Sequence, residues 1–227
     1  VLKPVIKPVV AVYPTAFTDQ TGQRKSNSEF ALFSTAITQQ PNALLIRALK
    51  HAGNGDFFTV VERVGLDNLT KERQLIRSTR KDFKESKDLL PLTFAGLLME
   101  GGVIGYESNI KSGGLGARYL GIGSTKEYRQ DIVTVSLRTV SVSTGKVLTE
   151  VLTTKSILSV AISQDAFRFV SNDTELVEIE NGMVENESVN IALQNAIETA
   201  VLETIQLGLK KNLWSIINEE ILNAIRG

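Results

Sequence analysis

Cysteine is absent from all 227 residues. The chain therefore has no disulfide framework, no thiolate nucleophile and no cysteine-based zinc site. Its only histidine, His51, stands beside a glycine turn at the end of an expected helix, where a favourable interaction with the helix dipole explains it without catalysis. Nucleophile-elbow, metalloprotease and calcium-loop motifs are also missing. We therefore expect no enzyme, no metal and no other cofactor.

The formal net charge is zero, because 25 Lys and Arg balance 25 Asp and Glu. Without a basic field the chain has nothing to recruit nucleic acid, and we expect no such partner. No run of about 18 apolar residues occurs, which excludes a hydrophobic membrane helix. Membrane β-strands give a much weaker signal per segment and are not excluded. Since the sequence opens at Val1 without an initiator methionine, we expect a leader or longer N-terminus to precede it.

The pattern of apolar residues predicts an α+β fold with a core of its own. Apolar runs rich in β-branched residues predict strands over 9–13, 57–61, 97–106, 132–142 and 146–158. Helical spacing of apolar residues predicts helices over 41–50, 66–80 and 188–209, and a terminal helix from Leu213 to Ile225. The third of these helices carries a continuous apolar stripe and is expected to cover the sheet.

The glycine-rich stretch from Gly101 to Gln130 has three interpretations. A phosphate-binding loop fails, because Gly116 and Gly121 have the right spacing but Ile122 and Gly123 stand where a Lys and a hydroxyl are needed. An ordinary surface hairpin is the simplest alternative. The third is a membrane-inserting hairpin, since its arms over 110–119 and 121–130 match the ~9–11 residues that a tilted strand needs to cross a bilayer.

A second extended pair follows over 160–184, with turn residues at 171–174. In its returning arm Val177 and Ile179 alternate with Glu178 and Glu180, so one face is apolar and the other acidic. If the apolar face meets lipid, both glutamates face a pore lumen. An acid/base pair is disfavoured, because an exposed strand gives no burial to separate two carboxyl pKa values.

Several blocks of the chain resemble the curli-production secretion channel family of outer-membrane lipoproteins. The blocks are Asp19-x-Thr21-Gly22-Gln23, Phe33-Ser34-Thr35-Ala36, Glu62-Arg63-x-Gly65-Leu66-x-Asn68-Leu69-x-x-Glu72-Arg73, Ile104-Gly105-Tyr106-Glu107-Ser108-Asn109, Lys111-Ser112-Gly113-Gly114-x-Gly116-Ala117-Arg118-Tyr119-x-Gly121-Ile122-Gly123, Phe167-Arg168-Phe169 and Ala196-Ile197-Glu198-Thr199. Together they span nearly the whole chain in order.

The resemblance implies a secretion channel in the bacterial outer membrane with its soluble domain in the periplasm. It implies a periplasmic α+β domain over 1–109, transmembrane hairpins over 110–130 and 160–184, a periplasmic strand pair over 131–159 and C-terminal helices over 185–227. The implied partners are further copies of the chain in a ring of about nine sharing one β-barrel, outer-membrane lipid, unfolded curli subunits, a periplasmic cap factor and an extracellular nucleation accessory factor. Two alternatives stay open: a periplasmic ring or scaffold that never inserts, and a ligand-binding lipoprotein of the cell envelope.

The resemblance also implies a pore constriction in the loop over 24–33, built from rings of Tyr, Asn and Phe. Phe33 matches the Phe, Leu32 stands in place of the Asn, and the Tyr position falls on Asn27 or Ser28. Phe30 is a competing ring, and anchoring into the core is the ordinary alternative for Phe33. Family members carry a lipidated N-terminal cysteine. We expect that segment to lie upstream of Val1 or to be missing from this form.

Overall fold

The computed structural model describes residues 3–22, 40–85, 87–112, 127–163, 166–171 and 185–217. Within them seven strands form one mixed sheet in the order β3-β1-β4-β5-β6-β7, with β2 paired to β4 beside this path. The strands are β1 (Val9–Ala11), β2 (Phe17–Asp19), β3 (Thr59–Val61), β4 (Leu97–Ser112), β5 (Glu127–Ser141), β6 (Val147–Ser163) and β7 (Ala166–Ser171). The helices are α1 (Asn42–His51), α2 (Leu66–Asp82) and α4 (Glu185–Lys210).

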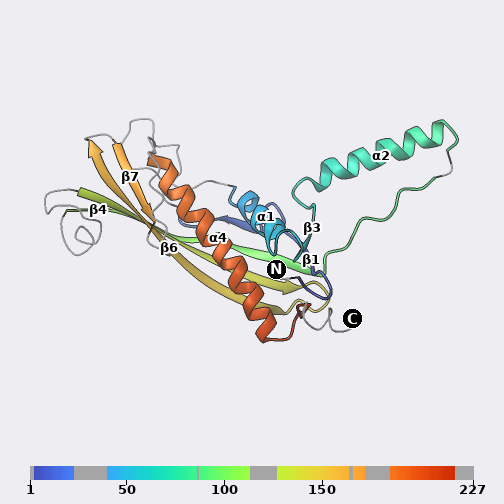
Figure 1. Cartoon of the computed structure of the whole chain (residues 1–227). Helices are drawn as coiled ribbons and strands as arrows, with labels where there is room; N and C mark the ends of the chain where they lie inside the picture. The colour runs from blue at the N-terminus through green and yellow to red at the C-terminus, as the bar shows by residue number, and fades with distance from the viewer. Residues whose placement is uncertain are drawn as a thin grey trace, which may run out of the picture.

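The sheet has a short parallel part and a long antiparallel part. β1 lies parallel to β3 and β4, and β2 lies parallel to β4. β4 through β7 are antiparallel, and β4 and β6 contain 16 and 17 residues, several times the usual ~5–6. The long strands run away from the parallel part toward one end of the molecule (Figure 1). The expected α+β class is therefore confirmed at the level of the domain.

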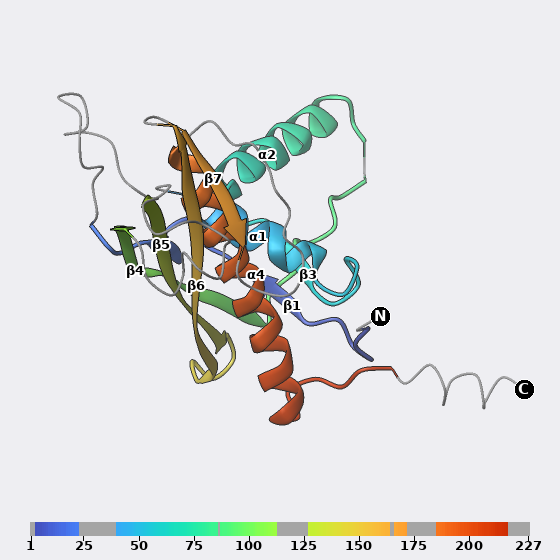
Figure 2. The ribbon, with the colours of Figure 1, turned by 60° about the vertical axis from the view of Figure 1, so that its left-hand side comes forward.

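Helices α1 and α4 cover one face of this sheet (Figures 1 and 2). The stripe predicted on α4 is buried: Val189, Ala192, Leu193, Ala196, Ile197, Val201 and Ile205. On β5, Val133, Val135 and Leu137 are buried while Thr134 and Ser136 between them stay half-exposed, as alternation across a strand requires. The core thus lies between the long antiparallel strands and the two helices.

The loop after α1 forms as the sequence predicts. Gly53, Asn54 and Gly55 all have positive φ, at 61°, 57° and 82°, which two glycines and an asparagine accept more readily than other residues. This loop leads into the buried pair Phe57 and Phe58, whose rings pack edge to face against Trp214 at centroid distances of 5.8 and 6.2 Å. Trp214 is therefore a core residue.

The predicted terminal helix is wrong over Leu213–Ile217. This segment is extended and runs against the N-terminal residues, where Ile216 forms an antiparallel bridge with Pro4. The backbone N–H of Val5 donates to Ser215 O, and that of Ile217 donates to Lys3 O, both at 2.8 Å. Pairing with a segment more than 200 residues away competes with helix formation, and no local apolar pattern reports it.

Candidate functional site

The candidate site is the end of the sheet where the long strands leave the cover of α4. There β4 and β5 stay paired through Ile110 with Arg129, Lys111 with Tyr128 and Ser112 with Glu127. β6 pairs with β5 up to Tyr128 and with β7 up to Ser163. Four adjacent antiparallel strands therefore emerge together from the domain (Figure 1).

A buried polar contact holds the base of these strands. Asp131 on β5 is fully buried, and the hydroxyl of Tyr106 on β4 donates to its Oδ1 at 3.4 Å. Asp131 faces Ser108 across one strand pair and Ile157 across the other. Because a buried carboxyl group is costly unless it is hydrogen-bonded, this contact fixes β4 relative to β5 where the apolar core ends.

The opposite face of the same strands carries several polar side chains. Thr134 and Thr154 share a hydrogen bond at 3.0 Å between their hydroxyl oxygens. Further along, Arg138 pairs with Glu100 at 3.5 Å and stands opposite Glu150 in the register. A β-bulge between Val103 and Gly105 shifts the register of β4 just before Tyr106. Such a bulge strengthens the local twist of the strand pair as it leaves the domain.

The second strand pair turns earlier than expected. β6 ends at Ser163, and β7 begins at Ala166 and pairs back over Ile157–Ser163, so the chain has already reversed direction before the turn expected at 171–174. Glu178 and Glu180 lie outside the described residues, as does Arg118. The division of the chain at 110–130 and 160–184 stays a prediction.

The residues expected at a constriction, Asn27, Ser28, Leu32 and Phe33, also lie outside the described residues, and so does Phe30. The segments that flank this loop are described: β2 ends at Asp19 and α1 begins at Asn42. β2 pairs with β4 through Phe17 and Gly101, Thr18 and Gly102, and Asp19 and Val103. The loop is thus anchored at one end to the strand that leads to the candidate site. Sequence reasoning missed β2, because a three-residue strand ending in Asp looks like a turn.

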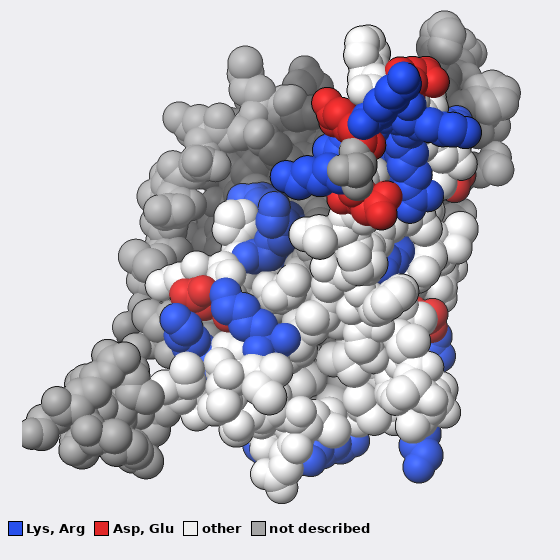
Figure 3. All heavy atoms as spheres, turned by 90° about the vertical axis from the view of Figure 1, so that its right-hand side faces the viewer, with Lys and Arg blue, Asp and Glu red and all other residues white. Residues whose placement is uncertain are grey.

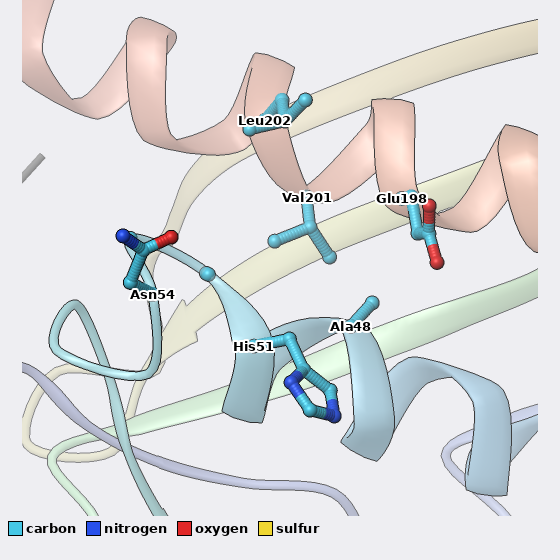
Figure 4. A pocket seen from close by; sticks show the side chains of 8 residues that line it. Ala48, His51, Asn54, Glu198, Val201 and Leu202 are labelled. Carbon is cyan, nitrogen blue, oxygen red and sulfur yellow. The ribbon is translucent and has the colours of Figure 1, made fainter. Parts of the chain in front are cut away.

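His51 lines a cavity of about 320 Å³ between α1 and α4, together with Ala48, Ala52, Gly53, Asn54, Glu198, Val201 and Leu202. Figure 4 shows Ala48 and Val201 facing each other across it, with His51 and Glu198 at its edges. Sequence reasoning missed this cavity because its two walls lie about 150 residues apart.

No cluster of metal-binding side chains occurs among the described residues. Within the same residues no helix is long and apolar enough to cross a membrane.

An ion pair on the surface shifts the pKa of one carboxyl group. The Nζ of Lys7 donates to Oδ1 of Asp56 at 2.6 Å. This hydrogen bond, the charge of Lys7 and the more distant charge of Lys3 lower the pKa of Asp56 from its ordinary value of 3.8. The pair ties the N-terminal segment to the loop between α1 and β3, far from the candidate site.

Comparison with known proteins identifies the family. The family model described as "Curli production assembly/transport component CsgG" matches residues 2–223. The curli production assembly/transport component CsgG of Escherichia coli is 42% identical over 220 residues, which cover 95% of this chain and 77% of that protein. The protein of the same description from Salmonella typhimurium gives the same identity and coverage.

Two solved structures are only distantly similar. A hypothetical protein of Chlamydia trachomatis has a TM-score of 0.44 at 12% identity, covering 89% of this chain and 97% of that one. A PelC dodecamer from Paraburkholderia phytofirmans has a TM-score of 0.32 at 13% identity, covering 88% and 91%. Both TM-scores are below 0.5. The family model and the sequence relatives show that this chain belongs to the CsgG family of curli production assembly/transport components.

Proposed function

We propose that this chain is the subunit of an outer-membrane channel that passively conducts unfolded curli subunits from the periplasm to the cell surface. Membership of a family of transport components supports a role in moving protein. The observation that carries the step to a channel is the set of four adjacent antiparallel strands, β4 to β7, that leaves the domain beyond its helix cover.

These strands need other copies of the chain. In lipid, every backbone N–H and C=O must be paired within the protein, and an isolated set of strands leaves two edges unpaired. Closing a ring of identical subunits removes those edges. Four strands from each of about nine subunits would give ~36 strands, the upper end of known membrane barrels. Outer-membrane lipid then surrounds the barrel, and the α+β domains form a periplasmic vestibule.

The loop over 24–33 forms the constriction in this proposal. Phe33 contributes an aromatic ring of side chains, with Leu32 beside it and Asn27 or Ser28 as a more polar ring. Glu178 and Glu180 line the barrel lumen. Unfolded curli subunits pass through, while a periplasmic cap factor and an extracellular nucleation accessory factor bind the two ends of the channel.

Purification in detergent followed by electron microscopy and planar-bilayer recording tests this function. We expect a wide ring that requires detergent and conducts ions. A ring that stays soluble without detergent and gives no conductance would favour a periplasmic scaffold. A monodisperse monomer would favour a ligand-binding lipoprotein.

A further inference from the structure

Helix α2 stands away from the rest of the domain (Figure 1). None of its 17 residues is buried, and its packing against the other described helices and strands is slight. A lone helix of this length is only marginally stable in water, because most helical stability in proteins comes from packing an apolar face. The helix therefore needs a surface that its own domain does not provide.

We define the arm as α2 together with the return segment 87–95, which runs back to β4. Two arginines of α2 donate to backbone carbonyls of the return segment, Arg73 to Leu90 at 2.6 Å and Arg80 to Lys87 at 2.7 Å, and Arg63 just before the helix donates to Thr93 at 2.9 Å. These bonds hold the two parts of the arm together, so the arm keeps its shape while it projects.

The tip of the arm carries an exposed aromatic side chain next to a charged hollow in which cations outnumber carboxylates. Phe83 directly follows α2 and is 77% exposed. At about 1.5 Å per residue, the helix carries it roughly 25 Å from the start of α2. A hollow of about 290 Å³ beside it is lined by four cations and two carboxylates: Arg77, Arg80, Lys81, Lys87, Glu85 and Asp88. Figure 3, viewed from the side on which α2 projects, shows Lys and Arg gathered at this end of the molecule, with Asp and Glu interspersed among them.

The cavity between α1 and α4 has the complementary chemistry. Ala48, Ala52 and Val201 form its apolar floor, Leu202 at its edge is 49% exposed, and Glu198 is the only carboxylate among its lining residues, with no Lys or Arg. Its volume of about 320 Å³ lies in the range of sites that enclose a bulky group, and an aromatic side chain buries ~150–250 Å² in such a site.

Charge favours a second copy of the chain as the occupant. Residues 66–90 hold seven Lys or Arg and five Asp or Glu, a net charge of +2. Since the whole chain is neutral, the remainder carries −2. An arm and a cavity at different places on one subunit make a head-to-tail contact, which is the kind of contact that closes into a ring.

We propose that the arm of one subunit docks on the next subunit, with Phe83 entering the cavity between α1 and α4 and the surrounding cations facing Glu198. This contact rests on the proposed ring and specifies which surfaces join its subunits. Phe83 is the anchor of this interface, because its ring becomes buried in the apolar cavity. Glu198 at the edge of the cavity is opposite in charge to the cations that lie near Phe83.

Paired cysteines test the contact directly, because the 227 residues contain no cysteine of their own. In the full-length chain, Phe83→Cys combined with Leu202→Cys should give a ladder of disulfide-linked multimers under mild oxidation. A disulfide requires Cα atoms within ~7 Å, so the ladder reports direct contact. The matched control combines Phe83→Cys with Leu152→Cys, which is 62% exposed on the other face of the sheet. All three positions are exposed, so the variants should fold.

The outcomes separate this inference from the proposed function. A ladder from Phe83→Cys with Leu202→Cys, and none from the control pair, supports the docking. Phe83→Ala should then weaken subunit association by roughly tenfold or more. A ladder from the control pair only, or a complete ring with no ladder from either pair, overturns the docking and leaves the ring in place. Unchanged assembly of Phe83→Ala with reduced curli export in cells also overturns it, because the arm then serves another partner. Absence of any ring overturns both.

Discussion

Gly208 near the end of α4 lies directly against the indole ring of Trp214, so that a Cβ at position 208 would collide with three ring atoms. The indole N–H donates to Ile205 O at 3.0 Å, which places the ring across the last turn of the helix. Trp214 also packs against Phe57 and Phe58. The glycine and the tryptophan therefore form one packing unit that ends α4.

Gly208→Ala should destabilise the domain by about 1–3 kcal/mol through overpacking. In an ordinary helix interior the same change would stabilise by ~1 kcal/mol, so helix propensity predicts the opposite sign. Thermal unfolding monitored by circular dichroism measures the difference. Gln206→Ala, on the exposed side of the same turn, is the matched control and should change little. In a Trp214→Ala background the clash is gone, and a Gly208→Ala change that still destabilises there would contradict this account.

The contact between Tyr106 and Asp131 should contribute modestly to stability, and the buried carboxyl group itself should contribute more. Tyr106→Phe is expected to cost ~0.5–1.5 kcal/mol, at the low end because the bond is 3.4 Å long. Asp131→Ala should cost more, because it removes a fully buried acceptor and leaves a void. Thr154→Val is the control, since it removes a hydrogen bond at an exposed position of the same sheet and should stay within ~0.5 kcal/mol. Chemical unfolding of the three variants ranks them, and equal losses would contradict the special role of the base contact.

The Lys7–Asp56 pair predicts a small pH dependence. The pKa of Asp56 is lowered in the folded chain, so the pair stabilises above the ordinary pKa of an aspartate and stops doing so as pH falls through the lowered value. Lys7→Met should raise the pKa of Asp56 toward 3.8, as followed by NMR titration of its carboxyl group. Lys3→Met should raise it less, because Lys3 acts only by charge from farther away. A larger shift for Lys3→Met would show that the hydrogen bond from Lys7 is not the main cause.

Local patterns predicted most of the elements, and contacts distant in sequence explain the errors. The buried stripe of α4 and the glycine loop after α1 follow from spacing and backbone chemistry alone. The strand β2 and the extended segment around Ile216 do not, because each forms by pairing with residues far away. The helix α2 was predicted from the helical spacing of its apolar residues, but the sequence gives no sign that none of its residues is fully buried within the subunit. The cavity between α1 and α4 exists only once the two helices pack.

Glu178 and Glu180 should make the channel cation-selective. A ring of carboxylates lining a lumen attracts cations and repels anions, as acidic rings do in other channels. Replacing both by Gln removes that charge and should shift the reversal potential in a salt gradient toward zero. Glu203→Gln is a control, since Glu203 lies on α4, away from the barrel strands and outside the lining of the cavity between α1 and α4. An unchanged reversal potential in the double variant would place the two glutamates away from the lumen.

Phe33→Ala should raise single-channel conductance severalfold while the ring still assembles. A ring of aromatic side chains narrows the conduit but binds a passing chain only weakly, so removing it widens the path without removing a core contact. Conductance in planar bilayers and ring size in detergent are measured on the same preparation. Phe30→Ala is the control, because Phe30 is the competing aromatic in the same loop and should leave conductance unchanged. If Phe33→Ala instead lowers the melting temperature or breaks the ring with conductance unaltered, Phe33 anchors the loop into the core, and an increase in Phe30→Ala would move the constriction to that residue.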